Sequence, residues 1–160
     1  MHTLLMSKKL TLMPPPAALE EQGSLNPLDQ LLGYQLRRAS VAMLADLGGG
    51  LAALDLRVTE ASVLMVIGAN PDITQSEVCR VLSIQRANMV PLATQLERRG
   101  LIHKGAAIGR AQALCLTQAG RKIVRECQER ISAHEARFLD GLTKEQGEAL
   151  ITQIRRIWDR

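Results

Sequence analysis

The segment between residues 74 and 117 restricts the fold of this chain more than any other part of its sequence. Thr74 and Glu77 have the spacing of a capping box, in which each side chain bonds an otherwise unpaired amide at the start of a helix. This helix is short and ends at Ser83. A second helix follows and ends at Gly100, a residue suited to a left-handed C-terminal cap. One face of the second helix, with the i, i+3, i+4, i+7 spacing of a buried stripe, is formed by Met89, Leu92, Ala93 and Leu96.

A hairpin is predicted directly after this pair of helices. Residues 101–104 and 112–116 have the alternation of short strands, and the glycine-containing segment 105–109 is predicted to be the turn between them. A short capped helix, a tight turn, a longer helix and a basic two-stranded hairpin are, in this order, typical of a winged helix-turn-helix. We therefore expect a mainly α fold with a small β-hairpin wing.

The rest of the chain is predicted to be helical after a tail. Residues 1–24 contain three consecutive prolines and no periodicity, so we expect no regular structure there. Asn26 and Pro27 suit a helix start, and three glycines at 48–50 are predicted to end that helix. Further helices are expected after Thr59, Thr117 and Thr143, each of which can serve as an N-cap. In the helix after Thr117 the residues expected to face inward are Ile123, Val124, Cys127, Ile131 and Phe138.

Composition and charge restrict the classes of function that this chain can have. Between Thr74 and Arg125 the sequence has nine basic and two acidic residues, although the whole chain has a net charge of only +4. A basic segment of this kind favours contact with phosphate, and a solvated basic face is the alternative. Three cysteines without paired spacing argue against disulfides and a zinc site and favour the cytoplasm. No motif of an enzyme, metal site, cofactor site or membrane span is present, so we expect none of these.

The outward face of the second helix and the wing supply the candidate DNA contacts. Gln and Asn side chains can pair with adenine and Arg with guanine in the major groove, while small apolar groups can touch thymine methyls. The alternatives are that Gln85 serves only as an N-cap, Arg86 only as a phosphate contact, and Arg98 as a partner of the helix dipole. The candidate DNA-binding residues are Thr74, Gln75, Gln85, Arg86, Ala87, Asn88, Val90, Pro91, Thr94, Arg98, Lys104 and Arg110.

These residues, in this order and spacing, resemble the multiple antibiotic resistance regulator (MarR) family over about residues 32–158. The matching pieces include Leu32–Ala39, Thr74–Glu77, Ile84–Val90, Leu96–Ile102 and Leu114–Gly120. The resemblance implies a homodimer that represses transcription, binds a pseudo-palindromic operator in double-stranded DNA, and releases it when a small-molecule effector, such as an aromatic acid, binds. It implies an N-terminal dimerisation helix and linker at 25–58, a DNA-binding module at 59–117 and C-terminal dimerisation helices at 118–160. The ligand pocket implied by the resemblance is lined by Tyr34, Arg38, Met43, Leu47 and Met65.

The sequence departs from the family pattern in the wing. Family members usually carry Asp-Arg-Arg there, whereas this chain has Ile108-Gly109-Arg110 and keeps only the last arginine. This departure leaves a second hypothesis open, in which the winged helix is a protein-interaction or dimerisation module with little DNA affinity. A third hypothesis is a redox-responsive regulator that uses Cys79 or Cys115.

Overall fold

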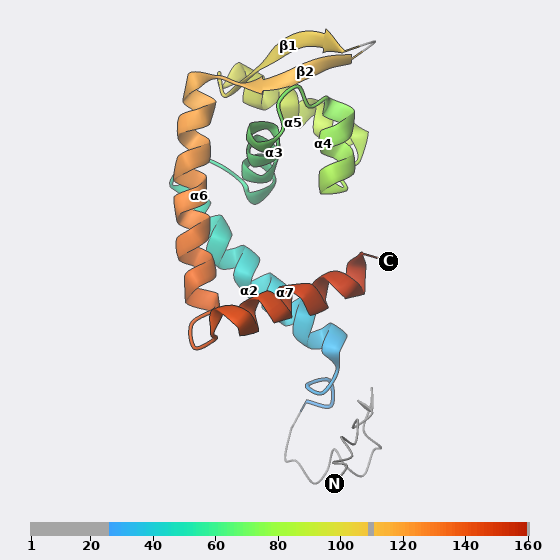
Figure 1. Cartoon of the computed structure of the whole chain (residues 1–160), viewed down its shortest axis with the longest axis vertical. Helices are drawn as coiled ribbons and strands as arrows, with labels where there is room; N and C mark the ends of the chain where they lie inside the picture. The colour runs from blue at the N-terminus through green and yellow to red at the C-terminus, as the bar shows by residue number, and fades with distance from the viewer. Residues whose placement is uncertain (1–25, 109–110, 160) are drawn as a thin grey trace, which may run out of the picture. The chain divides into compact units, whose positions relative to one another are not determined.

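The computed structural model describes residues 26–108 and 111–159, which are drawn in colour in Figure 1. These residues divide into one compact unit up to Leu44 and a second from Ala45 onward. A two-stranded antiparallel sheet lies between the fourth and fifth of the helices described. The elements are α2 (Leu32–Ala52), α3 (Val58–Ala69), α4 (Gln75–Leu82), α5 (Arg86–Arg98), β1 (Ile102–Ile108), β2 (Ala111–Leu116), α6 (Gln118–Phe138) and α7 (Lys144–Trp158). This order confirms the mainly α fold with a hairpin wing. Within the described ranges, no helix has both the length and the apolar character that a membrane span requires.

The core of the second unit is built around α3. This helix packs against α4, α6 and β2, and Figure 1 shows it between α6 and α4. The predicted stripe of α5 is confirmed, because Met89 and Leu96 are fully buried and Ala93 nearly so, with Leu92 packed against them. The largest fully buried side chains are Leu51, Leu64, Met89, Leu96, Val63, Val78 and Cys127. Burial raises the pKa of the Cys127 thiol, as expected for a small buried group in an apolar setting.

The predicted start of the first helix is wrong by several residues. Residues 27–30 form turns, and α2 begins at Leu32. The Asn26 side chain does not cap a continuous helix: its Oδ1 accepts from the Leu28 amide, and its Nδ2 donates to Asp29 Oδ1 and to Tyr34 Oη. These local bonds favour a turn over a helix at this point.

The predicted end of the same helix is also wrong. The glycines at 48–50 lie inside α2, which continues to Ala52. Leu51, directly after them, is fully buried in the core, and Arg130 of α6 donates a hydrogen bond to the Gly50 carbonyl at 3.2 Å. Burial and this tertiary contact outweigh the low helix propensity of glycine, which is about 1 kcal/mol per residue.

Helix α3 begins earlier than predicted, with Arg57 rather than Thr59 at the N-cap. The Glu60 carboxylate reaches back and accepts from the Arg57 amide at 2.7 Å. Glu60 is only 2% exposed, and its other oxygen faces the guanidinium of Arg99 at 3.6 Å. The Glu60 side chain therefore caps the start of α3 and also joins it to the end of α5 through a partly buried ion pair.

The inner face of α6 differs from prediction at its C-terminal end. Ile123, Val124, Cys127 and Ile131 are buried or half-buried as expected, but Phe138 is 41% exposed. His134 takes the buried position one turn earlier, with its Nδ1 2.7 Å from Asp46 Oδ2 of α2. Hydrogen bonds from His134 and Arg137 lower the pKa of the Asp46 carboxyl. A polar contact that is invisible to a hydrophobic pattern therefore replaces the expected aromatic one.

Candidate nucleic-acid interface

The first turn of α4 is held by its capping box, as the sequence predicts. Thr74 Oγ1 accepts from the Glu77 amide at 3.4 Å, and Glu77 Oε2 accepts from the Thr74 amide at 2.8 Å and from its hydroxyl at 2.7 Å. These bonds from Thr74 lower the pKa of the Glu77 carboxyl. Helix α4 ends at Leu82, and its C-cap residue Ser83 adopts a left-handed conformation with a φ of 53°. The two caps fix the length of α4 and hence the point at which the chain turns into α5.

Helix α5 presents a polar face to solvent because its opposite face is in the core. Its C-terminus closes in a Schellman motif: the Leu101 amide donates to the Leu96 carbonyl at 3.0 Å and the Gly100 amide to Glu97 at 2.9 Å. Gly100 has the positive φ of 67° that this motif requires. The predicted outward residues are confirmed as exposed: Gln85, Arg86, Ala87, Asn88, Val90, Pro91, Thr94 and Arg98.

The wing is longer than predicted and is attached to α4. Residues 105–108, predicted as turn, belong to β1, and Ile108 pairs with Ala111. The register shifts between Lys104 and Ala107, where a side chain at Gly105 would lie 2.7 Å from Cys115 Sγ. The Leu114 amide donates to the Ile73 carbonyl at 2.8 Å, directly before α4. This bond fixes the base of the hairpin relative to the helix-turn-helix.

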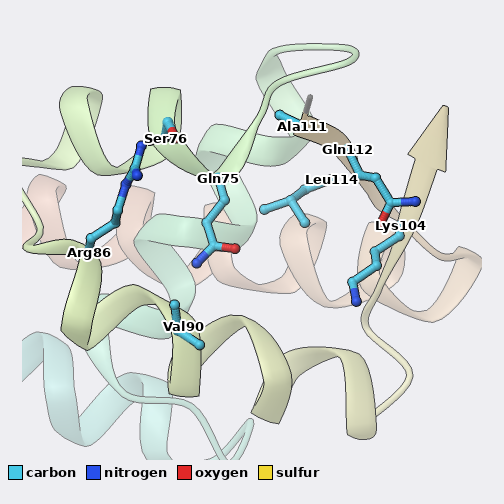
Figure 2. Close-up of a pocket in the computed structure, with 8 residues that line it drawn as sticks. All are labelled: Gln75, Ser76, Arg86, Val90, Lys104, Ala111, Gln112 and Leu114. Carbon is cyan, nitrogen blue, oxygen red and sulfur yellow. Dashed lines mark hydrogen bonds between the residues drawn. The ribbon is translucent and has the colours of Figure 1, made fainter. Parts of the chain in front are cut away.

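A groove of about 380 Å³ lies between the N-terminus of α4, the exposed side of α5 and the wing (Figure 2). The structure brings four of the predicted residues together here, namely Gln75, Arg86, Val90 and Lys104. The remaining lining residues are Ser76, Ala111, Gln112 and Leu114. Figure 2 shows the Arg86 side chain directed toward Ser76, and its Nη2 donates to Ser76 Oγ at 2.7 Å.

Two polar residues of this groove, Ser76 and Gln112, were not predicted from the sequence. Ser76 lies one residue before Glu77 of the capping box. Its position in the first turn of α4 is the feature of the sequence from which its place in the groove could be predicted. Gln112 was visible only as a strand position. Both carry groups that can bond phosphate or a base edge, so they extend the candidate interface.

Gln85 and Asn88 lie on a different side of α5, in a hollow of about 500 Å³ that Arg57 and Thr59 also line. Although Gln85 occupies the N-cap position, its side chain makes no capping hydrogen bond. The side-chain amide of Gln85 is therefore available for another partner.

Thr74 is buried and serves the capping box, so its candidate role is to position α4. Arg110 lies outside the described residues.

The predicted effector-pocket residues divide between the two units. Tyr34, Arg38 and Met43 belong to the unit that ends at Leu44, where the Arg38 guanidinium lies 5.8 Å from the centre of the Tyr34 ring. Leu47 and Met65 belong to the second unit and are half-buried against its core. Within the described ranges, no cluster of His, Cys, Asp and Glu side chains is suited to a metal ion.

We expect Thr74→Ala to lower the free energy of unfolding by about 1 kcal/mol, because it removes an N-cap acceptor. The pKa of Glu77 is lowered in the folded chain. The stabilisation that its ionised carboxylate provides is therefore fully present above the usual pKa of a glutamate, and it is lost as the pH falls through the lowered pKa. Urea unfolding at pH 7 and below pH 4 measures both effects. Thr74→Ser should retain the wild-type stability and pH dependence; equal losses for both variants would contradict this account.

Comparison with known proteins gives consistent matches. A model of the MarR family matches residues 54–112. An HTH-type transcriptional repressor of Mycobacterium tuberculosis is 28% identical over 120 residues, which cover 74% of this chain and 86% of the relative. A structure of the transcriptional repressor CouR bound to a 23-mer DNA duplex is 31% identical, with a TM-score of 0.77, and covers 84% of this chain and 96% of that one. CouR bound to p-coumaroyl-CoA is 30% identical with a TM-score of 0.74 and the same coverage.

Proposed function

The chain belongs to the MarR family of transcriptional regulators, and from this membership we propose that it is a repressor that binds a pseudo-palindromic operator as a homodimer. One observation carries the proposal. The exposed side of α5 and the base of the wing form a single polar groove in a fold that matches a DNA-bound repressor at 31% identity. A helix of this size fits the major groove, and the wing lies beside it to reach the backbone.

The proposed base contacts are Gln85, Arg86 and Asn88, at the N-terminal end of α5. Recognition helices place these first residues against base edges. Lys104 and Arg98 are proposed to contact phosphates, with Gln75 and Thr94 completing the described surface. Arg110, outside the described residues, is a further proposed DNA contact. Lys104 lies 3.9 Å from Glu97, an exposed pair of low energy that a phosphate can displace.

The homodimer is proposed to use the apolar faces of α2 and α7. Both helices expose large apolar side chains in the single chain, and Trp158 is 68% exposed. Two copies related by a twofold axis present two winged modules to two half-sites. The exposed apolar residues of these helices are Leu32, Val41, Leu44, Leu150, Ile151, Ile157 and Trp158.

The proposed effector is an aromatic acid or its thioester, because a relative binds p-coumaroyl-CoA. Tyr34 and Arg38 are proposed to hold its aromatic and acidic groups, with Met43, Leu47 and Met65 against its apolar part. The proposed activity is binding without catalysis. We place it in the cytoplasm, where a chromosomal operator and reduced cysteines are found together.

The test is selection of bound duplexes from a random pool, followed by anisotropy titration across a salt series. We expect a dyad-symmetric site with half-sites about one helical turn apart and a steep salt dependence. Arg86→Ala should weaken the selected operator about tenfold or more and abolish discrimination at one base pair, since a bidentate contact is worth about 1–3 kcal/mol.

Lys104→Ala is the matched comparison for Arg86→Ala. It should weaken all duplexes alike and reduce the salt slope by about one. Weak binding without any selected sequence, even at low salt, would remove the repressor proposal and leave the protein-interaction module. Addition of p-coumaroyl-CoA or a related aromatic acid to the complex then tests the effector class through release of the labelled duplex.

A further inference from the structure

Helix α5 contains a proline on its exposed side. Pro91 is the sixth residue of the helix, and it has no backbone N–H. In an α-helix the amide of residue 91 bonds the carbonyl of residue 87. The Ala87 carbonyl therefore lacks its helical donor, and it does so in the first turns of the helix proposed to enter the major groove.

The two residues that this missing hydrogen bond would join are both exposed. Ala87 and Pro91 are both exposed and, being four residues apart, lie on the same side of α5. The carbonyl of Val90, another exposed residue, differs because it accepts from the Thr94 hydroxyl at 3.0 Å. The N-terminal half of α5 thus offers a backbone acceptor that an ordinary recognition helix keeps bonded internally.

We propose that the Ala87 carbonyl accepts a hydrogen bond from the exocyclic amino group of an adenine or cytosine in the operator, and that Pro91 is a specificity-determining residue because it withholds the competing amide. The proposal rests on the proposed function of α5 as the recognition helix. Under this proposal Pro91 acts through its missing backbone amide, in addition to any contact that its ring makes with DNA.

The chemistry makes this acceptor selective. A carbonyl oxygen only accepts hydrogen bonds. In the major groove adenine N6 and cytosine N4 carry donors, whereas guanine offers N7 and O6 and thymine offers O4, all acceptors. A guanine or thymine edge at this place would set acceptor against acceptor, and the carbonyl would lose its water without gaining a donor.

The test combines protein variants with base analogues at each position of the selected operator. Purine in place of adenine and pyrimidin-2-one in place of cytosine remove only the amino group. For the wild type, we expect one position in each half-site at which this removal weakens binding about five- to tenfold, the size of one hydrogen bond. Pro91→Ala restores the amide and should bring the loss at that position below twofold.

Val90→Ala is the comparison variant. Val90 lines the proposed interface, so this variant is expected to lower the affinity for every operator. It leaves the backbone bonding of Ala87 unchanged, so the ratio between its affinities for the intact operator and for the operator without the amino group should equal the wild-type ratio. Helical circular dichroism and the melting temperature check that Pro91→Ala folds, and both should equal or exceed the wild-type values because a helical hydrogen bond is gained.

The outcomes separate this inference from the function on which it rests. If the wild type selects no operator, the repressor proposal and this inference both fail. If the wild type selects an operator but Pro91→Ala retains the full loss at every amino group, the repressor stands and the inference is overturned. Loss of the dependence in both Pro91→Ala and Val90→Ala also overturns it, since the effect then comes from the apolar surface.

Discussion

Gly120→Ala is expected to destabilise the chain by about 3 kcal/mol and to abolish operator binding. A Cβ at this position would overlap the Leu101 carbonyl oxygen and lie 3.0 Å from the carbonyl carbon. Both atoms belong to the backbone, so no side chain can rotate away, and overpacking without such relief costs about 1–3 kcal/mol or more. The start of α6 would have to move away from the base of the wing.

The same place is the junction between the wing and α6. Thr117 donates its amide to the Leu101 carbonyl at 3.0 Å and its hydroxyl to the Gly100 carbonyl at 2.6 Å, while the Gly120 amide donates to Thr117 Oγ1 at 2.9 Å. A displaced helix start breaks these bonds together. We therefore expect the loss of stability to be accompanied by a loss of wing position and of DNA affinity.

Urea unfolding and operator titration measure this prediction. Gly49→Ala is the matched control, because Gly49 is an exposed helical glycine with no atom within 4 Å of an added Cβ. That variant should gain up to about 1 kcal/mol from helix propensity and bind DNA as the wild type does. A Gly120→Ala chain with wild-type stability would show that the junction relaxes freely, contrary to the packing described here.

Arg99→Met is expected to have the second large effect, a loss of about 2–4 kcal/mol. Arg99 faces two carboxylates, Glu60 Oε1 at 3.6 Å and Asp55 Oδ2 at 3.3 Å. Asp55 is almost fully exposed and contributes little. Glu60 is buried, and within the described ranges its Oε1 is the buried side-chain oxygen that lacks a hydrogen bond, so removal of Arg99 leaves its charge uncompensated.

A double-mutant cycle with Glu60→Gln tests this assignment. Glu60→Gln in the Arg99→Met background should recover part of the lost stability, because a neutral amide is less costly to bury than an unpaired carboxylate. Arg98→Met is the control, since Arg98 is exposed and forms no ion pair in the part of the chain described, and its stability should change by less than about 0.5 kcal/mol. Additive losses at Arg99 and Glu60 would contradict a coupled pair.

Arg99→Met and Arg86→Ala are expected to differ in their effect on DNA binding. Arg99 lies at the C-terminus of α5 and ties it to the start of α3, which lines the same hollow as Gln85 and Asn88 but not the groove that Arg86 lines. Its removal should weaken the operator only as far as α5 loses its position. Operator affinity measured at a temperature where Arg99→Met remains folded should therefore fall less than for Arg86→Ala.

Local chemistry explains why the sequence by itself determined the helix-turn-helix. Thr74, Thr117 and Thr143 cap helices through bonds to amides three residues away, and Gly100 closes α5 through bonds within one turn. These devices need no distant partner. The inward stripe and outward face of α5 follow from the same short periodicity, so the amino-acid sequence alone is enough to assign the exposed residues of this helix.

Tertiary structure alone decided the features that depend on distant partners. The glycines at 48–50 remain helical because Leu51 is buried and Arg130 bonds the Gly50 carbonyl from 80 residues away. Strand β1 extends to residue 108 because Gln112 and Ala111 of β2 pair with residues 107 and 108, and His134 is buried because Asp46 lies opposite it. The pairing of Arg86 with Ser76 likewise appears only when α4 and α5 are packed. Propensity is a local preference of about 1 kcal/mol per residue or less, and burial in a core exceeds it wherever the two conflict.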